Sequence, residues 1–259
     1  MVIASHTLGY YELFSLEFGT IAVSTFFFIS GYLMPLTYEK NYAHFDWKIG
    51  MKKFFINRFI RIFPIYWVTI LIPIAMAVFH TLIHGKWEGI NPSPTLLGWL
   101  QNILLIGLNQ SIFWGGYDRI NNPAWTLDVE LQYYLLVPFF FFAYQKFKKT
   151  TIFGLFFVSI IGLFFYFRPV NLVDIDRSFF AWSFFFIAGF LFYKFQANYV
   201  IISKWLITIA IIAFSLSFEL DLERLVSFKT FLYSLVFISI SIPLLIIQKE
   251  FRFHNLIKN

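Results

Sequence analysis

Residues 57–79 read NRFIRIFPIYWVTILIPIAMAVF, and this stretch decides the class of fold. Arg58 and Arg61 stand at the entry of an apolar run that is long enough to cross about 30 Å of hydrocarbon. Similar runs recur along the 259 residues, of which 59% are hydrophobic and only 13% charged. A water-soluble domain carries about a quarter charged residues. The chain is therefore predicted to be an integral membrane protein with several helical spans.

The apolar runs predict an all-α, polytopic membrane bundle that occupies the whole chain, 1–259, as a single domain. About eight spans are expected, at residues 1–11, 19–38, 60–80, 125–144, 151–167, 178–195, 200–218 and 229–248. The first run is long enough for only about half a crossing. A further run, 96–108, is too short to span and is expected to form a re-entrant or interfacial helix.

The charges fall in short clusters between the apolar runs. With the loop between the second and third predicted spans in the cytoplasm, about 14 of the 20 Lys and Arg residues lie inside and about 6 outside. This alternation is typical of membrane loops, so the net charge of +6 does not indicate a nucleic-acid partner. The chain has no cysteine, which excludes thiol nucleophiles, Cys-ligated zinc and disulfides.

Ionisable groups inside a membrane span are costly and are therefore candidates for function. Arg58 and Arg61, with Lys52 and Lys53 just upstream, gather positive charge at the cytoplasmic mouth of the third predicted span. Helix positions three apart share a face, and guanidinium groups bind phosphate bidentately. The alternative is that the arginines only reach to lipid head groups and fix the topology.

Two further candidates lie in other predicted spans. His6 in the first span suits a general base, because burial keeps imidazole neutral, although it could equally be a hydrogen-bonded packing residue. Asp128 and Glu130 are about 200° apart around a helix, so we expect only one of them to face the interior. Asp128 suits the positive N-terminal end of the helix dipole. Glu130 lies deeper, with Tyr133 and Tyr134 available as hydrogen-bond partners, and is the functional candidate.

Two weaker patterns receive structural interpretations. His80 and His84 have the spacing of a helical zinc pair, but no glutamate stands between them and no third ligand is evident, so we predict no metal. Ser30 and Gly31 indicate a small-residue site at which two helices pack closely.

Four stretches, in this order along the chain, resemble the membrane acyltransferase 3 family. ASHTLGY (4–10) looks like the histidine-bearing end of the family's first helix, and FFFISGYL (26–33) looks like its second-helix segment. FFINRFIRIFPIYW (54–67) looks like the arginine-rich entry to its third helix. NPAWTLDVELQYYLLVP (122–138) looks like its tryptophan and glutamate segment. The ordered set covers about the first half of the chain.

The resemblance implies an O-acyltransferase. Members of the family move an acyl group, expected here to be acetyl, from cytoplasmic acyl-CoA to a hydroxyl of an extracytoplasmic or lipid-linked sugar or polysaccharide. His6 would be the catalytic base, and Glu130 would orient or stabilise the site. Arg58 and Arg61, with the two upstream lysines, would bind the phosphates of CoA. The family bundle has about ten spans, so we expect this chain to lack the start of the first helix and the last helices.

This interpretation gives the chain three partners: the lipid bilayer, acyl-CoA and a glycan acceptor. We expect no nucleic acid, no metal and no permanently bound cofactor, and a location in the cytoplasmic (inner) membrane of a bacterial cell. Two other classes stay open. A glycan or lipid transporter or flippase is one, although the repeated halves with broken helices common in transporters are not found. A non-catalytic partner of a polysaccharide synthase is the other.

Overall fold

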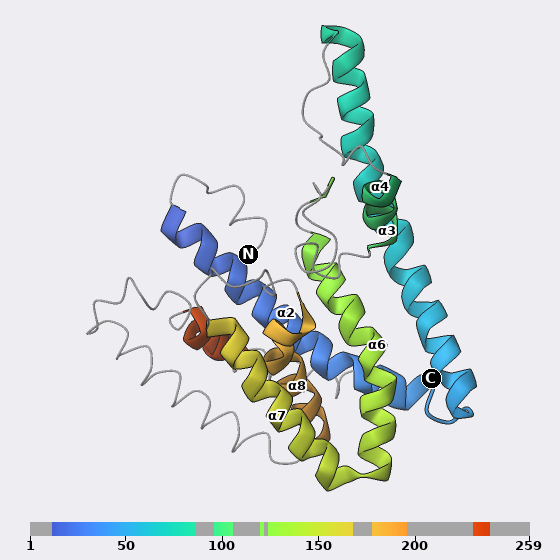
Figure 1. Ribbon diagram of the computed structural model, residues 1–259, viewed down its shortest axis with the longest axis vertical. Helices are drawn as coiled ribbons and strands as arrows, with labels where there is room; N and C mark the ends of the chain where they lie inside the picture. Colours follow the sequence, from blue (N-terminus) through green and yellow to red (C-terminus); the bar gives the residue numbers. More distant parts are fainter. Residues whose placement is uncertain are drawn as a thin grey trace, which may run out of the picture. The chain divides into compact units, whose positions relative to one another are not determined.

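The computed structural model describes residues 12–85, 96–105, 120–121, 124–167, 178–195 and 230–238, and every regular element within these ranges is a helix (Figure 1). The helices are α2 (Glu12–Asn41), α3 (Trp47–His84), α4 (Leu96–Leu104), α6 (Trp125–Lys146), α7 (Lys148–Phe167), α8 (Phe179–Phe195) and a helical segment at 230–238. The predicted all-α class is confirmed. The predicted spans at 1–11 and 200–218 lie outside the described residues.

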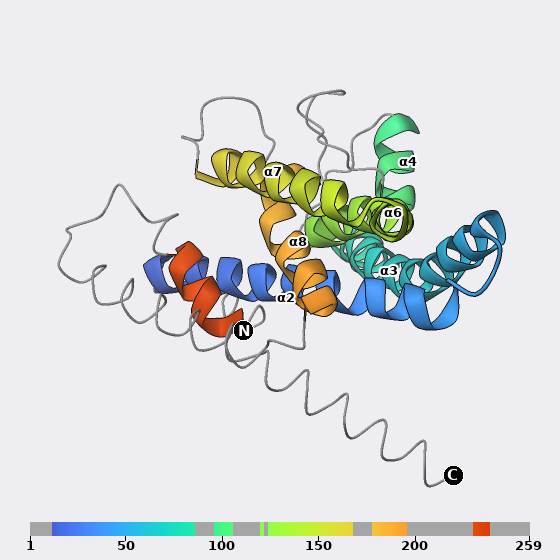
Figure 2. The same cartoon turned by 90° about the horizontal axis from the view of Figure 1, so that it is seen from below.

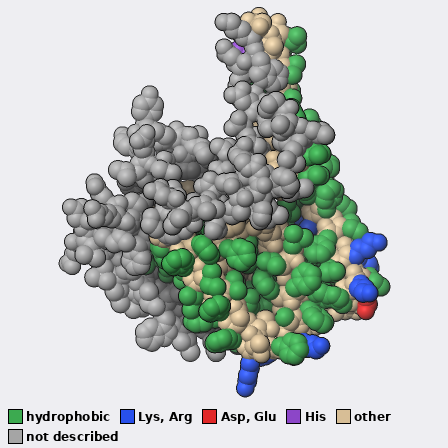
Figure 3. All heavy atoms as spheres, viewed as in Figure 1, with side chains coloured by type: hydrophobic (Ala, Val, Ile, Leu, Met, Phe, Trp, Pro, Cys, Tyr) green, Lys and Arg blue, Asp and Glu red, His purple; other side chains and the backbone are tan. Residues whose placement is uncertain are grey.

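Three of the described helices are long and apolar enough to cross a membrane: Gly19–Asn41 within α2, all of α3, and α7. Large apolar side chains are exposed on them, including Leu82 at 80% and Phe153 at 72% of their surface. Water penalises such surfaces and lipid does not. Hydrophobic side chains cover much of the described surface in Figure 3. The chain is an integral membrane protein, and the number of about eight spans stays a prediction.

The chain divides into two compact units, one formed by Met1–Leu33 with Phe184–Asn259 and the other by Met34–Ser183. In the first unit, parts of α2 and α8 are in backbone contact. A Cβ atom on Gly31 would lie 2.2 Å from the carbonyl oxygen of Phe186, and one on Gly189 would lie 2.2 Å from that of Phe28. Only glycine permits this approach. The small-residue packing site predicted in the FFFISGYL segment is confirmed.

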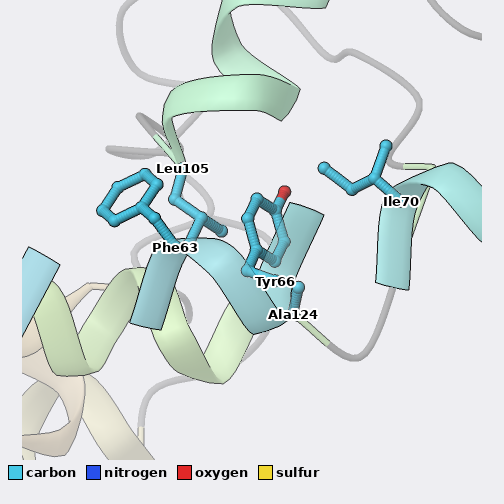
Figure 4. Packing of buried hydrophobic residues seen from close by; sticks show 5 residues of the cluster. All are labelled: Phe63, Tyr66, Ile70, Leu105 and Ala124. Atoms are coloured by element: carbon cyan, nitrogen blue, oxygen red, sulfur yellow. The ribbon is translucent and has the colours of Figure 1, made fainter. Parts of the chain in front are cut away.

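In the second unit, α3 and α6 run antiparallel. The Trp47 ring lies 4.8 Å from that of Phe142, near the C-terminal end of α6, whereas Ile70 shares a hydrophobic cluster with Ala124 at its N-terminal end. Figure 4 shows this cluster, which contains Phe63, Tyr66, Ile70, Leu105 and Ala124. Helix α7 follows α6 after a single residue and packs beside it (Figures 1 and 2).

Helix α4 is held to α3 by hydrogen bonds to its last carbonyl groups, which a helix end leaves without intrahelical partners. The Tyr66 hydroxyl donates to the Asn102 carbonyl at 2.6 Å, and the Trp67 indole Nε1 donates to the Ile103 carbonyl at 2.9 Å. The chain leaves α4 through Leu105, whose φ is 52°. With 9 residues, α4 is roughly 14 Å long and cannot cross a bilayer. The short helix is confirmed, and its re-entrant or interfacial placement stays a prediction.

Helices α2 and α3 begin earlier than their apolar runs predict. Helix α3 starts at Trp47 rather than near residue 60, because the side chain of Asp46 caps it by accepting from the Lys48 amide at 3.1 Å. Its other end is closed by Gly85 in the left-handed region. Helix α2 starts at Glu12 rather than near residue 19. An unbroken apolar run locates the part of a helix that is expected to meet lipid, and it misses an extension in which charged residues interrupt the apolar ones.

The glycine contact gives a first prediction. Replacing Gly189 by Leu forces a side chain into the backbone of α2 and is expected to destabilise the fold by about 1–3 kcal/mol or more. Gly154→Leu on α7 is the matched control, since nothing lies within 4 Å of a Cβ built there. Thermal unfolding in detergent measures both. An equal loss of stability in the two variants would contradict the close approach of α2 and α8.

Candidate functional site

The structure describes all but one of the predicted site residues and separates them by burial. Arg58 on α3 and Glu130 on α6 are buried, with 7% and 6% of their surface exposed. The other three basic residues are exposed on α3: Arg61, Lys52 and Lys53. The basic group read from the sequence as one cluster therefore consists of one interior charge and three surface charges.

Arg58 lies in an aromatic setting that leaves two of its guanidinium nitrogens without hydrogen bonds to the described residues. Its Cζ atom is 5.4 Å from the Phe54 ring centroid and 5.8 Å from that of Tyr134, both within the range of cation–π attraction. Its Nε and Nη1 atoms are buried and have no hydrogen-bond partner among the described residues. A buried charge without partners is strongly destabilising. The site can therefore accept an acceptor-rich, negatively charged group.

Arg58 and Arg61 do not share an environment, although they are only three positions apart. Successive helix residues turn by about 100°, so the two side chains leave α3 about 60° from each other. The buried stripe of α3 repeats every four residues at Gly50, Phe54 and Arg58. Arg58 continues this stripe and Arg61 falls beyond its edge. The predicted shared face is thus divided by the boundary between the interior and the surface.

Arg58 also lies well inside the length of the helices that surround it, and its depth in the membrane stays a prediction. Its neighbour Tyr134 is the tenth residue of the 22-residue helix α6. By helix rise, Tyr134 is about 14 Å from one end of α6 and about 18 Å from the other. Helix α3 begins at Trp47, so about 17 Å of helix precede Arg58. The guanidinium group lies between the ends of the helices that surround it.

Glu130 has one of the two hydrogen-bond partners that the sequence predicts. The Tyr134 hydroxyl donates to Oε1 of Glu130, one helical turn away on α6, and both residues are buried. The other candidate, Tyr133, packs instead against Phe179, with the two rings stacked at 6.1 Å between centroids. Arg58, Tyr134 and Glu130 thus form one buried group, which we call the arginine–tyrosine–glutamate group. The sequence names all three residues but not the contact of Tyr134 with Arg58.

The expectation that only one of Asp128 and Glu130 faces the interior is wrong. Asp128 is 2% exposed, less than Glu130. Helix α6 packs against both α3 and α7, so carboxylates on two of its faces can both be buried. The separation of about 200° is correct, but the inference assumed one covered face. Asp128 lies in the first turn of α6, which agrees with its structural interpretation.

A second contact region lies toward the start of α3, where residues after α2 fold against it. The Lys53 Nζ atom is 3.6 Å from the centroid of the Phe45 ring. The Asn57 side-chain amide donates to the Tyr42 hydroxyl at 2.8 Å. Lys53 is a predicted residue, but sequence reasoning missed Tyr42, Phe45 and Asn57, although the aromatic positions in 42–45 beside a lysine-rich helix are a signal that could have indicated them.

Two of the sequence predictions concern histidines. His6 lies outside the described residues, so its role as a base stays a prediction. His80 and His84 lie on α3 with ring centroids 4.4 Å apart. Within the part of the chain that the structure describes, no group of three or more His, Cys, Asp or Glu side chains could hold a metal ion.

Comparison with known proteins agrees with the family indicated by the sequence motifs. The described helices, three of them long and apolar enough to cross a membrane, define an integral membrane protein. The family model described as "Acyltransferase domain" matches residues 1–255. The chain belongs to this family, the membrane acyltransferase 3 family.

Three curated proteins are similar to parts of the chain. "Acyltransferase MdmB" of Streptomyces mycarofaciens is 29% identical over 134 residues, which cover 49% of this chain and 30% of that protein. "Peptidoglycan O-acetyltransferase OatA" of Listeria monocytogenes is 32% identical over 142 residues, or 51% of this chain and 21% of that protein. An uncharacterised protein of Haemophilus influenzae is 30% identical over 146 residues, or 54% and 56%.

The matched part therefore spans between about a fifth and just over half of these relatives. No solved structure matches the chain.

The buried arginine gives a second prediction. Arg58→Met removes a buried guanidinium group with two unbonded nitrogens and retains apolar volume, so it is expected to stabilise the fold by about 1–4 kcal/mol. Its apparent melting temperature in detergent should rise by about 2 °C or more. Arg61→Met, at an exposed position, is the control and should change it little. A fall in melting temperature with Arg58→Met would mean that the guanidinium group has a partner in the resting protein.

Proposed function

We propose that this chain is the membrane part of an O-acyltransferase that moves an acyl group, expected to be acetyl, from cytoplasmic acyl-CoA to a sugar hydroxyl. The acceptor is an extracytoplasmic or lipid-linked sugar or polysaccharide. One observation carries the proposal: in a chain of the acyltransferase family, Arg58 is buried with two guanidinium nitrogens that have no partner among the described residues. A resident structural arginine would be expected to have those partners.

The basic side chains suit the anionic end of acyl-CoA. Phosphate oxygens accept bidentate hydrogen bonds from a guanidinium group, whose planar donors are charged at any working pH. Arg58 can supply two such donors, and the rings of Phe54 and Tyr134 limit its orientation. Arg61, with the exposed lysines upstream, adds positive charge on the same helix. A donor with several phosphates can contact the interior and the surface charges together.

The transfer needs one proton to be moved. His6, acting as a general base, takes the proton from the sugar hydroxyl while its oxygen attacks the thioester carbonyl. A new oxygen ester forms, the carbon–sulfur bond breaks, and the proton passes to the leaving thiolate to give free CoA. Glu130 orients the site through its bond with Tyr134. The relatives support the acceptor class, since one of them is named for acetylating peptidoglycan.

Label transfer tests the reaction. Membranes that contain the chain are incubated with acetyl-CoA labelled in the acetyl group, beside the same membranes with His6→Ala. We expect label to appear in glycan with the parent chain and to fall by at least about 100-fold with the variant, because general-base catalysis contributes about 10²–10⁴-fold. A transporter or flippase makes no new ester. Label transfer that survives His6→Ala would remove His6 from the mechanism.

Donor affinity tests the role of the arginines. The dissociation constant of CoA is measured by equilibrium binding to the purified protein in detergent. Arg58→Ala should weaken binding by about 10-fold or more, since a charged hydrogen bond contributes about 1.5–3 kcal/mol. Arg61→Ala should weaken it less, because exposed charges interact weakly through water. Unchanged affinity in Arg58→Ala would overturn the assignment of Arg58 to the donor.

A further inference from the structure

Three residues that carry hydrogen-bond donors follow one another along an exposed edge of α3. Lys53, Asn57 and Arg61 are spaced four residues apart, so each lies one turn beyond the last on the same side of the helix. All three are exposed, and we call them the edge row. The row is about 12 Å long and lies about 60° around α3 from the buried stripe that contains Arg58.

The middle of the edge row is joined to the segment that precedes α3. The Nδ2 atom of Asn57 donates to the Tyr42 hydroxyl at 2.8 Å. Tyr42 directly follows α2 and is 6% exposed, with its ring centroid 5.5 Å from that of Phe54 in the buried stripe. The hydroxyl therefore lies where the aromatic interior meets the exposed edge of the helix.

The pair of Tyr42 and Asn57 carries donors that it does not use. An amide has two N–H groups and a phenol has one O–H group. One N–H is spent on the phenol oxygen, which acts as the acceptor, so the second N–H and the O–H are left. Neither side chain makes another hydrogen bond or an ion pair with the described residues. The pair can therefore donate to a further group at this edge.

The charges around the pair favour an anion as that group. The stretch 42–61 contains five lysine and arginine residues and a single acidic residue, Asp46, whose side chain caps α3. The Nζ atom of Lys53 lies 3.6 Å from the centroid of the Phe45 ring, which holds the ammonium group against the same segment that carries Tyr42. Phosphate oxygens accept hydrogen bonds from hydroxyl and amide side chains as well as from charged ones, as contacts with nucleic acids show.

We propose that Tyr42 and Asn57 are a neutral hydrogen-bonding pair that binds a phosphate of the acyl donor at the surface of α3, between Lys53 and Arg61. The inference rests on the proposed function, in which the donor is acyl-CoA and Arg58 binds another of its phosphates. Charged groups attract any anion, whereas neutral donors in fixed positions bind only oxygens that match them. The pair would thus select a donor that carries several phosphates along its length.

Equilibrium binding of CoA to the purified protein in detergent tests the pair. Tyr42→Phe should raise the dissociation constant by about tenfold, because a hydrogen bond to a charged group is lost. Asn57→Ala should raise it similarly, and the double variant should show less than the product of the two effects, since the residues act as a unit. Tyr38→Phe is the matched control: it removes a buried hydroxyl whose ring lies 6.0 Å from that of Tyr42, and it should leave the affinity unchanged.

Inorganic pyrophosphate separates a phosphate contact from a packing role. It carries phosphate groups and no other part of CoA, so we expect it to displace labelled CoA from the parent protein. Its inhibition constant should rise by about tenfold with Tyr42→Phe and stay unchanged with Tyr38→Phe. An unchanged constant with Tyr42→Phe, or no displacement from the parent protein, would overturn the inference.

The outcomes also separate the inference from the function on which it rests. If Arg58→Ala weakens CoA binding and Tyr42→Phe does not, the pair is not part of the donor site, and the proposed function stands. If Tyr42→Phe and Tyr38→Phe weaken binding equally, altered aromatic packing explains both, and the inference is wrong. If the parent protein does not bind CoA, the proposed function and the inference fall together.

Discussion

Two nitrogens of the Arg58 guanidinium group are buried in the second unit without hydrogen bonds to the described residues, and this constraint bears on the whole contact of α3 with α6. Removing a charged group from water costs several kcal/mol even after relaxation. A desolvated cation–π contact returns about 2 kcal/mol, so the rings of Phe54 and Tyr134 offset only part of the cost. The remainder must come from the packing of the unit or from a bound anion.

The packing that offsets the cost of burying Arg58 cannot rely on the hydrophobic effect between helices, because lipid is as apolar as the helix surfaces. Close contact and hydrogen bonding take its place. In the first unit, Gly31 and Gly189 allow backbone contact between segments of α2 and α8. In the second unit, Tyr66 and Trp67 bind the last carbonyls of α4. Each unit thus has its own short-range contacts in place of a hydrophobic driving force.

The helices could be predicted from the sequence, whereas their limits could not. Long apolar runs locate α2, α3, α6, α7 and α8, because only a helix satisfies every backbone group within a single segment in hydrocarbon. The start of α3 was missed since it depends on the cap at Asp46, and lysines interrupt the apolar residues that follow in WKIGMKKFFIN (47–57). The Ser30–Gly31 pair was interpreted correctly because small residues have one dominant use between membrane helices.

The site could be predicted as a list of residues but not as an arrangement. Arg58, Glu130 and Tyr134 can each be chosen from the sequence. The contact between Arg58 and Tyr134, however, joins positions 76 residues apart (134 − 58) and depends on how α3 packs against α6. Which of Arg58 and Arg61 enters the interior depends on a rotation of about 60°, which is smaller than the uncertainty of a face drawn from sequence. Asp128 was misjudged for the related reason that two covered faces of α6 were treated as one.

The proposed donor site contains both surface charges and one interior charge, and this division implies the order in which they act on the donor. Exposed charges such as those of Arg61, Lys52 and Lys53 act over distances of about a Debye length and are screened by salt, so they favour encounter with an anion more than they hold it. Arg58 lies about 8 Å further along α3 than Lys53, in an interior where its charge is weakly screened. An anionic head group attracted by the surface charges would therefore gain most of its binding energy only after reaching Arg58. On this argument ionic strength changes mainly the rate at which the donor associates, whereas the weakly screened charge of Arg58 sets how long the donor stays.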